Sequence, residues 1–301
     1  MNNLKKIGLT ALGASLVASS AHAATASVSA ATSLFFGGED NSNAGNGWSM
    51  TDSLTFSASG EMDNGFTIST SLEIDNAGVY DDRSISIDTG DMGKLTFSGS
   101  GTSGPVGAWD DLTPSANEES WGTAIVGTAD GPTNAAVGTN GFIYDYTVND
   151  MIAIKAAYEP SRGTAQVDSS TEFGVAFTGI EGLTIKAAMG ENNNTAAGVD
   201  NTVFSAVYAM GPITVGYQTN ESDSGTAAAD EDFTAMGISY AVSDDVSVSY
   251  GMSTLDYESS TKEDQDSSAV SISFTAGGVA ISASHQTTDN TAGTTTADNK
   301  G

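Results

Sequence analysis

The sequence predicts an all-β protein, specifically a transmembrane antiparallel β-barrel. Three observations support this fold class. Short segments alternate polar and apolar residues, the connections between them alternate between tight turns and long loops, and one long segment from Gly99 to Gly141 has no strand character. Successive side chains of a strand point to opposite faces, so alternation gives each segment one apolar and one polar face. Short turns at one end and long loops at the other are typical of transmembrane barrels.

The chain begins with the features of a secretory signal. Lys5 and Lys6 precede the apolar run Ile7 to Ala18, and Ala21-His22-Ala23 fits the small-x-small cleavage rule. The apolar run is shorter than the roughly 20 residues that a membrane-spanning helix needs. We therefore expect residues 1–23 to be a cleaved signal peptide and residues 24–301 to form the barrel.

Fifteen segments of the remaining chain fit β-strands. The alternation is clear in the segment where Ile152, Ile154 and Tyr158 share one face and Lys155 and Glu159 share the other. The opposite faces of most segments carry Ser, Thr, Gly and Ala, which suit a crowded or water-filled interior. The predicted strands are 26–36, 48–61, 66–75, 83–89, 93–99, 141–148, 151–159, 171–178, 182–190, 201–210, 212–219, 232–242, 245–257, 267–275 and 278–287.

The connections form two alternating sets. The short set is 62–65, 90–92, 149–150, 179–181, 211, 243–244 and 276–277, where Gly, Asn and Asp suit tight hairpins. The long set is 37–47, 76–82, 99–141, 160–170, 191–200, 220–231, 258–266 and 288–301. Bacterial single-chain barrels have even strand numbers. We therefore expect a sixteenth, closing strand of about ten residues that the given sequence lacks; the alternative is that one strand has been split or missed.

The 99–141 segment is the main candidate for a functional element. A structureless loop of this length inside a compact domain is uncommon unless it is functional. We expect it to fold back inside the barrel and narrow it. Its acidic side chains are expected to line the constriction: Asp110, Asp111, Glu118, Glu119 and Asp130.

Charged residues on the strands extend this candidate pore lining. The inward positions of the alternation predict that Lys94, Asp145, Lys155, Glu159 and Lys186 face the lumen. If residues 149–151 form the turn after the sixth strand, Asp145 lies opposite Lys155 and the two form an ion pair. Outward positions hold the aromatic residues that favour membrane–water boundaries; these are Phe142, Tyr144, Tyr146, Tyr158, Tyr208, Tyr217, Tyr240 and Tyr250.

The composition excludes several classes of function. The chain has 38 acidic and nine basic residues, a formal charge of −29, so no basic patch for nucleic acid can be assembled. There is no cysteine and hence no disulfide framework. After signal cleavage His285 is the one histidine, on an outward position, and no catalytic constellation is recognisable, so no enzyme is predicted. The acidic loops could bind calcium, although no EF-hand spacing occurs.

The order of these features resembles a known family. The signal peptide followed by Val28 to Phe36, and the run from Gly90 to Phe97 that leads into the long loop, are similar to Gram-negative general diffusion porins of the alphaproteobacterial type. The resemblance implies a homotrimer of 16-stranded outer-membrane barrels with the third external loop as constriction. Two features depart from the family pattern. The closing strand with its final aromatic residue is absent, and the mature chain has only Arg83 and Arg162 where the family clusters arginines.

The resulting functional expectation is a water-filled channel for passive transport of ions and small hydrophilic solutes, without reaction or cofactor. The acidic loop predicts cation preference, because a low-dielectric wall focuses its field into the lumen. Two alternatives remain open at the level of sequence. One is a structural or adhesive outer-membrane barrel with a plugged lumen, and the other is a soluble secreted calcium-binding β-sandwich.

Overall fold

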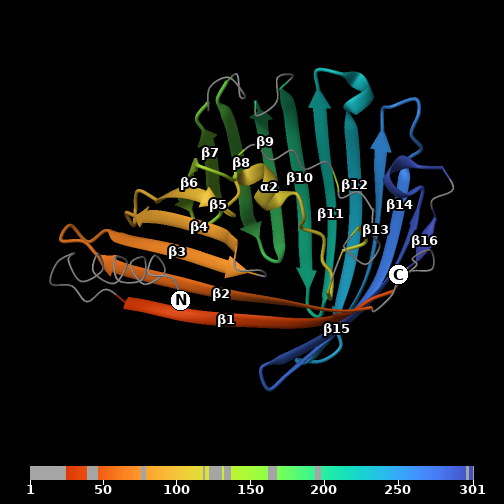
Figure 1. Ribbon diagram of the computed structural model, residues 1–301, viewed down its shortest axis with the longest axis horizontal. Coiled ribbons are helices and arrows are strands. Elements are labelled where there is room, and N and C mark those ends of the chain that lie inside the picture. The colour runs from red at the N-terminus through yellow and green to blue at the C-terminus, as the bar shows by residue number, and fades with distance from the viewer. Residues whose placement is uncertain are drawn as a thin grey trace.

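The protein folds into one antiparallel sheet of sixteen strands that twists and curves around an interior (Figure 1). The computed structural model describes residues 25–38, 47–75, 79–117, 119–121, 131, 137–161, 168–193, 198–295 and 298–300. The strands are β1 (Thr25–Phe36), β2 (Trp48–Glu61), β3 (Thr67–Asp75), β4 (Val79–Asp88), β5 (Lys94–Ser100), β6 (Gly141–Asn149), β7 (Ile152–Glu159), β8 (Ser170–Ile180), β9 (Leu183–Asn192), β10 (Val199–Met210), β11 (Ile213–Ser224), β12 (Glu231–Ala241), β13 (Val246–Tyr257), β14 (Gln265–Ala276), β15 (Val279–Asp289) and β16 (Asn299–Lys300).

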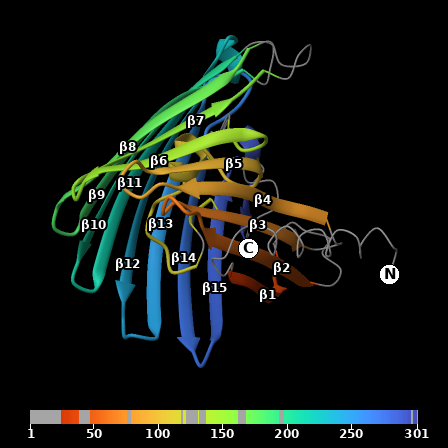
Figure 2. The same ribbon diagram turned by 90° about the vertical axis from the view of Figure 1, so that its left-hand side faces the viewer.

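Each strand pairs with the next strand in sequence, without any crossover. The sheet twists strongly, so β1 to β4 run across the direction of β10 to β15 in Figures 1 and 2. This crossing is expected when tilted strands of opposite barrel walls are seen together. The described helices are short: α2 (Pro105–Trp109), η1 (Ala227–Ala229) and η2 (Thr291–Gly293). Among the described residues, none of the helices has the length and apolar character needed to cross a membrane.

All fifteen predicted strands are present, most of their ends lie within two residues of the prediction, and three larger differences occur. Strand β4 begins at Val79 rather than at residue 83, because a register shift between Leu72 and Ile74 lets the chain stay paired through the predicted loop. Strand β11 extends to Ser224, since its polar end pairs with both neighbours. The predicted last loop, 288–301, contains β16, which pairs Asn299 with Thr288 on β15.

The two faces of the sheet have the predicted alternation. On β12, Met236, Ile238 and Tyr240 are exposed at 50%, 44% and 44%, whereas Phe233 and Ala235 on the opposite face are buried. We call the face that carries Met236 the outer face and the face that carries Phe233 the inner face. A soluble sandwich would bury its large apolar side chains, so this exposed apolar surface indicates contact with lipid instead.

The hairpin of β6 and β7 has the predicted register at Asp145, but a register shift between Thr147 and Asn149 pairs Asn149 with Ile152, so the turn is shorter than the predicted 149–151. Asp145 is the direct partner of Lys155, and Lys155 Nζ lies 3.4 Å from Asp145 Oδ1. Asn149 ends β6, and its side-chain Oδ1 accepts hydrogen bonds from the backbone N–H groups of Met151 and Ile152, which stabilises the turn. A cross-strand pair of opposite charge stabilises a sheet by about 0.2–1 kcal/mol.

Candidate functional site

The described part of the long loop lies on the inner face of the sheet. After β5 the chain forms α2, which lies against β8, β9 and β10 (Figure 1). It then continues as irregular chain to Trp121, contacting strands β11 to β13 in turn and reaching β15 through Asn117. The described residues of this segment therefore lie against the inner face of the sheet, and the expectation that the loop narrows a barrel lumen stays a prediction. Among the described residues, the predicted lack of structure was wrong at α2 and at the two ends of the segment, where Gly99 and Ser100 belong to β5 and Gly141 to β6.

Helix α2 packs on an apolar patch of the inner face. Val106 and Trp109 are buried against Ala188 of β9 and Val203 of β10. Gly174 of β8 lies directly beneath, and a Cβ atom there would overlap the Trp109 ring. The Trp109 ring also lies 5.6 Å from Lys186 Nζ, a cation–π contact of about 0.5–1 kcal/mol at such sites.

The neck of the loop, where the chain leaves β5 and returns to β6, is joined by one carboxylate. Glu172 of β8 is 4% exposed, and its Oε2 accepts a hydrogen bond from Val106 N–H while Oε1 accepts one from Val137 N–H, each 2.9 Å long. Gly104 N–H also donates to the Val137 carbonyl at 2.8 Å. Hydrogen bonds to charged groups contribute roughly 1.5–3 kcal/mol each. The outgoing and returning parts of the loop are thus fastened to the same point of the wall.

Two amide side chains on β11 hold the segment that follows α2. Gln218 accepts a hydrogen bond from Leu112 N–H through Oε1 at 2.7 Å, and its Nε2 donates to the Asp110 carbonyl. Asn220 Nδ2 donates to the same carbonyl at 2.9 Å. Gln218 and Asn220 are fully buried, so these bonds form away from water.

A row of three glycines forms the floor beneath the next segment. Gly216, Gly237 and Gly251 are direct cross-strand partners on β11, β12 and β13. Pro114 lies on the first two: a Cβ at Gly216 would overlap the proline ring, and a Cβ at Gly237 would lie 2.7 Å from the Pro114 carbonyl oxygen. Absence of side chains in this row lets the loop backbone approach the sheet closely.

Serine side chains and an aromatic cluster fix the loop further on. Ala116 N–H donates to Ser249 Oγ at 2.7 Å, and Ser120 Oγ donates to Ser253 Oγ at 2.9 Å. The Trp121 ring meets the Phe233 ring edge-on at 4.8 Å, within a buried cluster that also contains Ala235, Leu255 and Tyr257. Aromatic pairs of this geometry contribute about 0.5–1.5 kcal/mol beyond the area they bury.

The structure places the predicted lining residues at different depths. On the loop, Asp111 is exposed and Asp110 and Glu119 are half-buried, with Glu119 Oε1 accepting a hydrogen bond from Ser115 Oγ. Glu118 and Asp130 lie outside the described residues.

The predicted wall residues lie on the inner face of β5 to β9. Lys94 is the partner of Asp145, and Asp145 is the partner of Lys155, so the three charges follow one row. Lys186 is half-buried beneath α2, and Glu159 is 1% exposed. Their role as pore lining stays a prediction.

Arg83 lies away from this row. It is exposed, and its side chain covers Gly99 on the outer face, as the shared parity with Ile85 indicates. Arg162 lies outside the described residues.

The sequence alone did not predict the wall residues that hold the loop, Glu172, Gln218 and Asn220. A signal for the landing site was present in the alternation. Val203, Phe233 and Leu255 are apolar residues at inward positions, out of phase with the outer face, and all three are buried near the loop. An apolar residue at an inward position of a water-filled barrel needs a covering segment.

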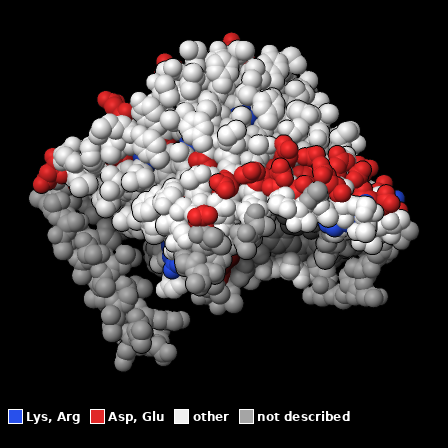
Figure 3. Space-filling view, turned by 90° about the horizontal axis from the view of Figure 1, so that it is seen from above, with Lys and Arg blue, Asp and Glu red and all other residues white. Residues whose placement is uncertain are grey.

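Carboxylates gather on the outer face at the end that carries the long loops. Glu221, Asp232 and Asp256 are exposed and in register across β11, β12 and β13, and Asp266 pairs with Asp289 on β14 and β15. Figure 3 shows the acidic atoms as a broad patch with few basic atoms among them. Like charges in register repel one another, and dissolved salt reduces the repulsion between these carboxylates.

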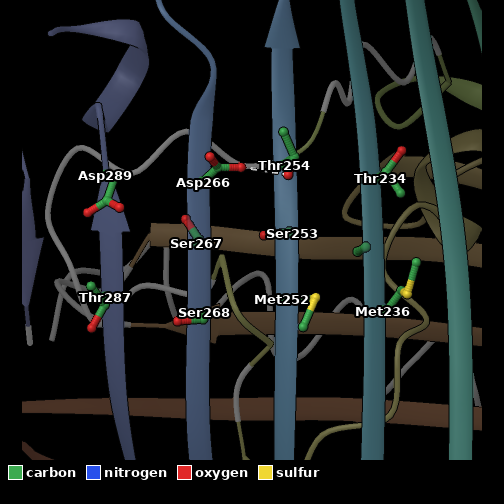
Figure 4. A pocket seen from close by; sticks show the side chains of 11 residues that line it. Thr234, Met236, Met252, Ser253, Thr254, Asp266, Ser267, Ser268, Thr287 and Asp289 are labelled. Atoms are coloured by element: carbon green, nitrogen blue, oxygen red, sulfur yellow. Dashed lines mark hydrogen bonds between the residues drawn. The ribbon is translucent and has the colours of Figure 1, made fainter.

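A hollow of about 270 Å³ on the outer face adjoins these carboxylates (Figure 4). Met236 and Met252 lie at its lower end and Asp266 and Asp289 at its upper end, where Thr254 Oγ1 donates to Asp266 Oδ1 at 2.7 Å. The hollow marks the change from apolar to polar surface. It lies on the outside of the sheet and is not part of the lumen.

No three His, Cys, Asp or Glu side chains within the described ranges are grouped closely enough to hold a metal ion. The option that the acidic loops bind calcium stays a prediction. His285 is exposed on the outer face of β15, as its parity indicated.

Comparison with known proteins agrees with this architecture. A family model described as Gram-negative porin matches residues 8–293. No curated protein sequence matched the chain. Among solved structures, the chain is similar to an anion-selective porin from Comamonas acidovorans, with 14% identity, a TM-score of 0.64, and coverage of 89% of this chain and 90% of that one.

Two further structures show the same fold. OmpT of Vibrio cholerae has 16% identity and a TM-score of 0.64, covering 90% of this chain and 88% of that one. A triple mutant of the Rhodopseudomonas blastica porin has 14% identity and a TM-score of 0.62, covering 92% and 97%. Because the family model spans most of the sequence, the chain belongs to the Gram-negative porin family. Membership of this family implies an outer-membrane porin channel.

Proposed function

We propose that the protein is a general diffusion channel that lets ions and small hydrophilic solutes cross the outer membrane passively. The observation that carries this proposal is the long loop bonded to the inner face through Glu172, Gln218, Ser249 and Ser253. A loop held in this way narrows the lumen but does not block it. Solutes are then selected by size and by the field of the lining charges.

The wall formed by the first strands suits polar solutes. Ser27, Ser57, Ser71, Ser84 and Ser98 are consecutive partners in one row across β1 to β5. Ser98 is fully buried and its hydroxyl bonds the loop. The hydroxyl groups of the other four serines donate and accept hydrogen bonds, so they can replace part of the hydration of a passing solute. Small side chains also leave the lumen open opposite the loop.

We further propose that the channel prefers cations. This proposal is supported by the net charge of −29 and by the acidic residues Asp110, Asp111 and Glu119 on the loop that lies against the inner face. Lys94 and Lys155 share a row with Asp145, which offsets part of their charge. The Comamonas protein is described as anion-selective, so the cation preference proposed here differs from that neighbour and rests on the charges of this chain alone.

Reversal potentials across a KCl gradient in planar bilayers test both parts of the proposal. We expect a conducting channel with cation preference that declines as salt rises, because the Debye length falls from about 10 Å at 0.1 M to about 3 Å at 1 M. Replacing Asp110, Asp111, Glu118 and Glu119 with their amides should reduce the preference.

The matched control replaces four outer-face acids, Asp232, Asp256, Asp266 and Asp289, with asparagine. It makes the same change in net charge and should leave the preference nearly unchanged. An anion-selective wild type would overturn the lumenal role of the acidic loop. A folded protein that does not conduct would favour a barrel with a plugged lumen.

The resemblance also supports two proposals about the protein in the cell. One is export through a signal peptide, residues 1–23, which lie outside the described residues. The other is assembly as a homotrimer within outer-membrane lipid. Mass measurement of the detergent-solubilised protein by light scattering tests the trimer, and a monomeric mass would contradict it.

A further inference from the structure

We infer that Glu172 is the positioning residue that sets the aperture of the channel, by clamping both ends of the constriction loop to β8. The consequence for conduction rests on the proposed function, whereas the clamp itself concerns only where the loop lies. The atoms that meet at this carboxylate come from the helix at the start of the loop and from the segment that returns to β6.

The first supporting observation is the geometry of the carboxylate. Each of its two oxygens accepts one backbone N–H, from Val106 and from Val137, at 2.9 Å. These donors are far apart in sequence, yet both reach a side chain that is 4% exposed. One side chain therefore closes the loop into a ring at its neck. Ser98 of β5 also bonds both ends, since its Oγ donates to the Gly138 carbonyl at 3.0 Å and accepts a hydrogen bond from Thr102 N–H at 3.2 Å. Glu172 differs from Ser98 because it fastens the two ends to β8, a strand that the loop does not itself connect.

The second observation is that α2 lacks a cap of its own. Gly104 occupies its N-cap position and makes no side-chain capping hydrogen bond. The Val106 N–H belongs to the first turn, where helix N–H groups have no partner within the helix. Glu172 supplies that partner from the wall, so the start of the helix is fixed to β8 rather than to its own preceding residue.

The third observation is that the Glu172 side chain fills the space between two glycines, so that neither glycine could carry a side chain. A Cβ at Gly104 would overlap Glu172 Oε2, and a Cβ at Gly190 of β9 would lie 2.6 Å from Glu172 Cγ. Both neighbours on the path of the side chain are glycines. The slot between them holds the Glu172 side chain in one position and with it the two loop segments.

Other charged groups near the neck do not take over this function. Glu159 of β7 is buried, on the inner face next to the Ser170 end of β8. Lys186 of β9 lies beneath Trp109, and Lys155 pairs with Asp145. The N–H groups of Val106 and Val137 both donate to Glu172 and not to any of these three side chains.

The test measures loop position independently of conduction. The chain has no cysteine, so the pair Ala108→Cys and Glu181→Cys can carry two spin labels, one on α2 and one in the turn between β8 and β9. We expect one narrow distance distribution by electron spin resonance in the labelled parent. Glu172→Ala should replace it by a broad distribution, and Glu172→Gln should give an intermediate one, because an amide accepts through its oxygen only.

Conductance measured on the same variants gives the functional arm. Glu172→Ala should lose the single steady conductance level and show fluctuating levels with a larger solute exclusion limit. The matched control is Glu191→Ala, which removes an exposed glutamate on β9 whose direct partner on β8 is Thr171. It should keep both the narrow distribution and the steady level.

If Glu172→Ala does not fold, Gly104→Ala provides the second variant, since it keeps the carboxylate but obstructs its slot. An unchanged distance distribution in every folded Glu172 or Gly104 variant would overturn the clamp. A broadened distribution in a protein that never conducts would retain the clamp and refute the channel. A conducting protein with unchanged distances would retain the channel and refute the clamp.

Discussion

At the scale of single residues, glycines on the inner face give the long loop room to approach the sheet. Gly216 and Gly237 lie beneath Pro114, and Gly174 lies beneath Trp109, so the loop contacts the backbone of the sheet. Gly251 belongs to the same row as Gly216 and Gly237, but its surroundings are more open. The row thus contains positions where a methyl group is excluded and one where it is tolerated.

This difference gives a paired prediction for Gly237→Ala and Gly251→Ala. A Cβ at Gly237 would lie 2.7 Å from the Pro114 carbonyl oxygen, which is a backbone atom that cannot move alone. Overpacking of this kind costs about 1–3 kcal/mol. A Cβ at Gly251 has its nearest neighbour at 3.5 Å, an ordinary contact, and Gly→Ala at such a site stabilises by about 0.4–1 kcal/mol.

Guanidinium unfolding of both variants in detergent or lipid measures the two effects. We expect a lower midpoint for Gly237→Ala and an unchanged or higher midpoint for Gly251→Ala. Equal midpoints would mean that Pro114 does not rest on the glycine row.

At the scale of elements, the long loop is the part that distinguishes this sheet from a simple barrel. It has a short helix, a fixed neck, and contacts along the inner face from β8 to β13. Its apolar anchors, Trp109 and Trp121, sit on patches that would otherwise expose apolar side chains to the lumen. The loop and the wall therefore bury each other's apolar side chains, as two packed layers of a soluble protein do.

Deletion of Gly104 to Gly131 is expected to enlarge the exclusion limit and to leave a folded barrel, because the outer face and the strand ladders are untouched. Liposome swelling with sugars of graded size measures the limit. Deletion of residues 226–229, which connect β11 and β12, is the control and should leave the limit unchanged. An unchanged limit in the larger deletion would place the loop outside the conducting path.

At the scale of the whole molecule, the exposed apolar side chains of the outer face define how the protein meets its surroundings. On β10 to β15 the exposed apolar residues lie toward the short turns. The carboxylates of Asp232, Asp256, Asp266 and Asp289 lie nearer the long loops. Within lipid every backbone hydrogen bond has to be made inside the protein. Each strand from β2 to β15 is hydrogen-bonded to a neighbouring strand on both sides, so the backbone groups of these strands find partners within the sheet.

A charge on the lipid-facing side should therefore be far more costly than one on the lumenal side. Ile238 and Ser239 are neighbours on β12, on the outer and the inner face. Ile238→Lys is expected to lower the free energy of unfolding in lipid vesicles by roughly 2–4 kcal/mol, the cost of lysine near the bilayer midplane, and Ser239→Lys by much less. Similar losses for both variants would contradict the assignment of the two faces.

How far the sequence predicts the structure differs between the strands and the site. Alternation with a period of two is a local property, so all fifteen predicted strands and the Asp145–Lys155 register are confirmed. The loop path depends on contacts between residues that are distant in the chain, such as Glu172 with Val106 and Val137. Nothing local to Glu172 distinguishes it from the other glutamates of the chain.

The sequence by itself therefore determined the class of fold, the order of strands, the division into two faces and the position of the long loop in the chain, because each of these follows from periodicity and turn chemistry. The tertiary structure alone decided where that segment rests. It placed Gly216, Gly237 and Gly251 in one row under the loop, and it buried Glu172 at the neck. The physical reason is that cross-strand register and burial arise only when distant strands are paired, and these determine which side chains meet the loop.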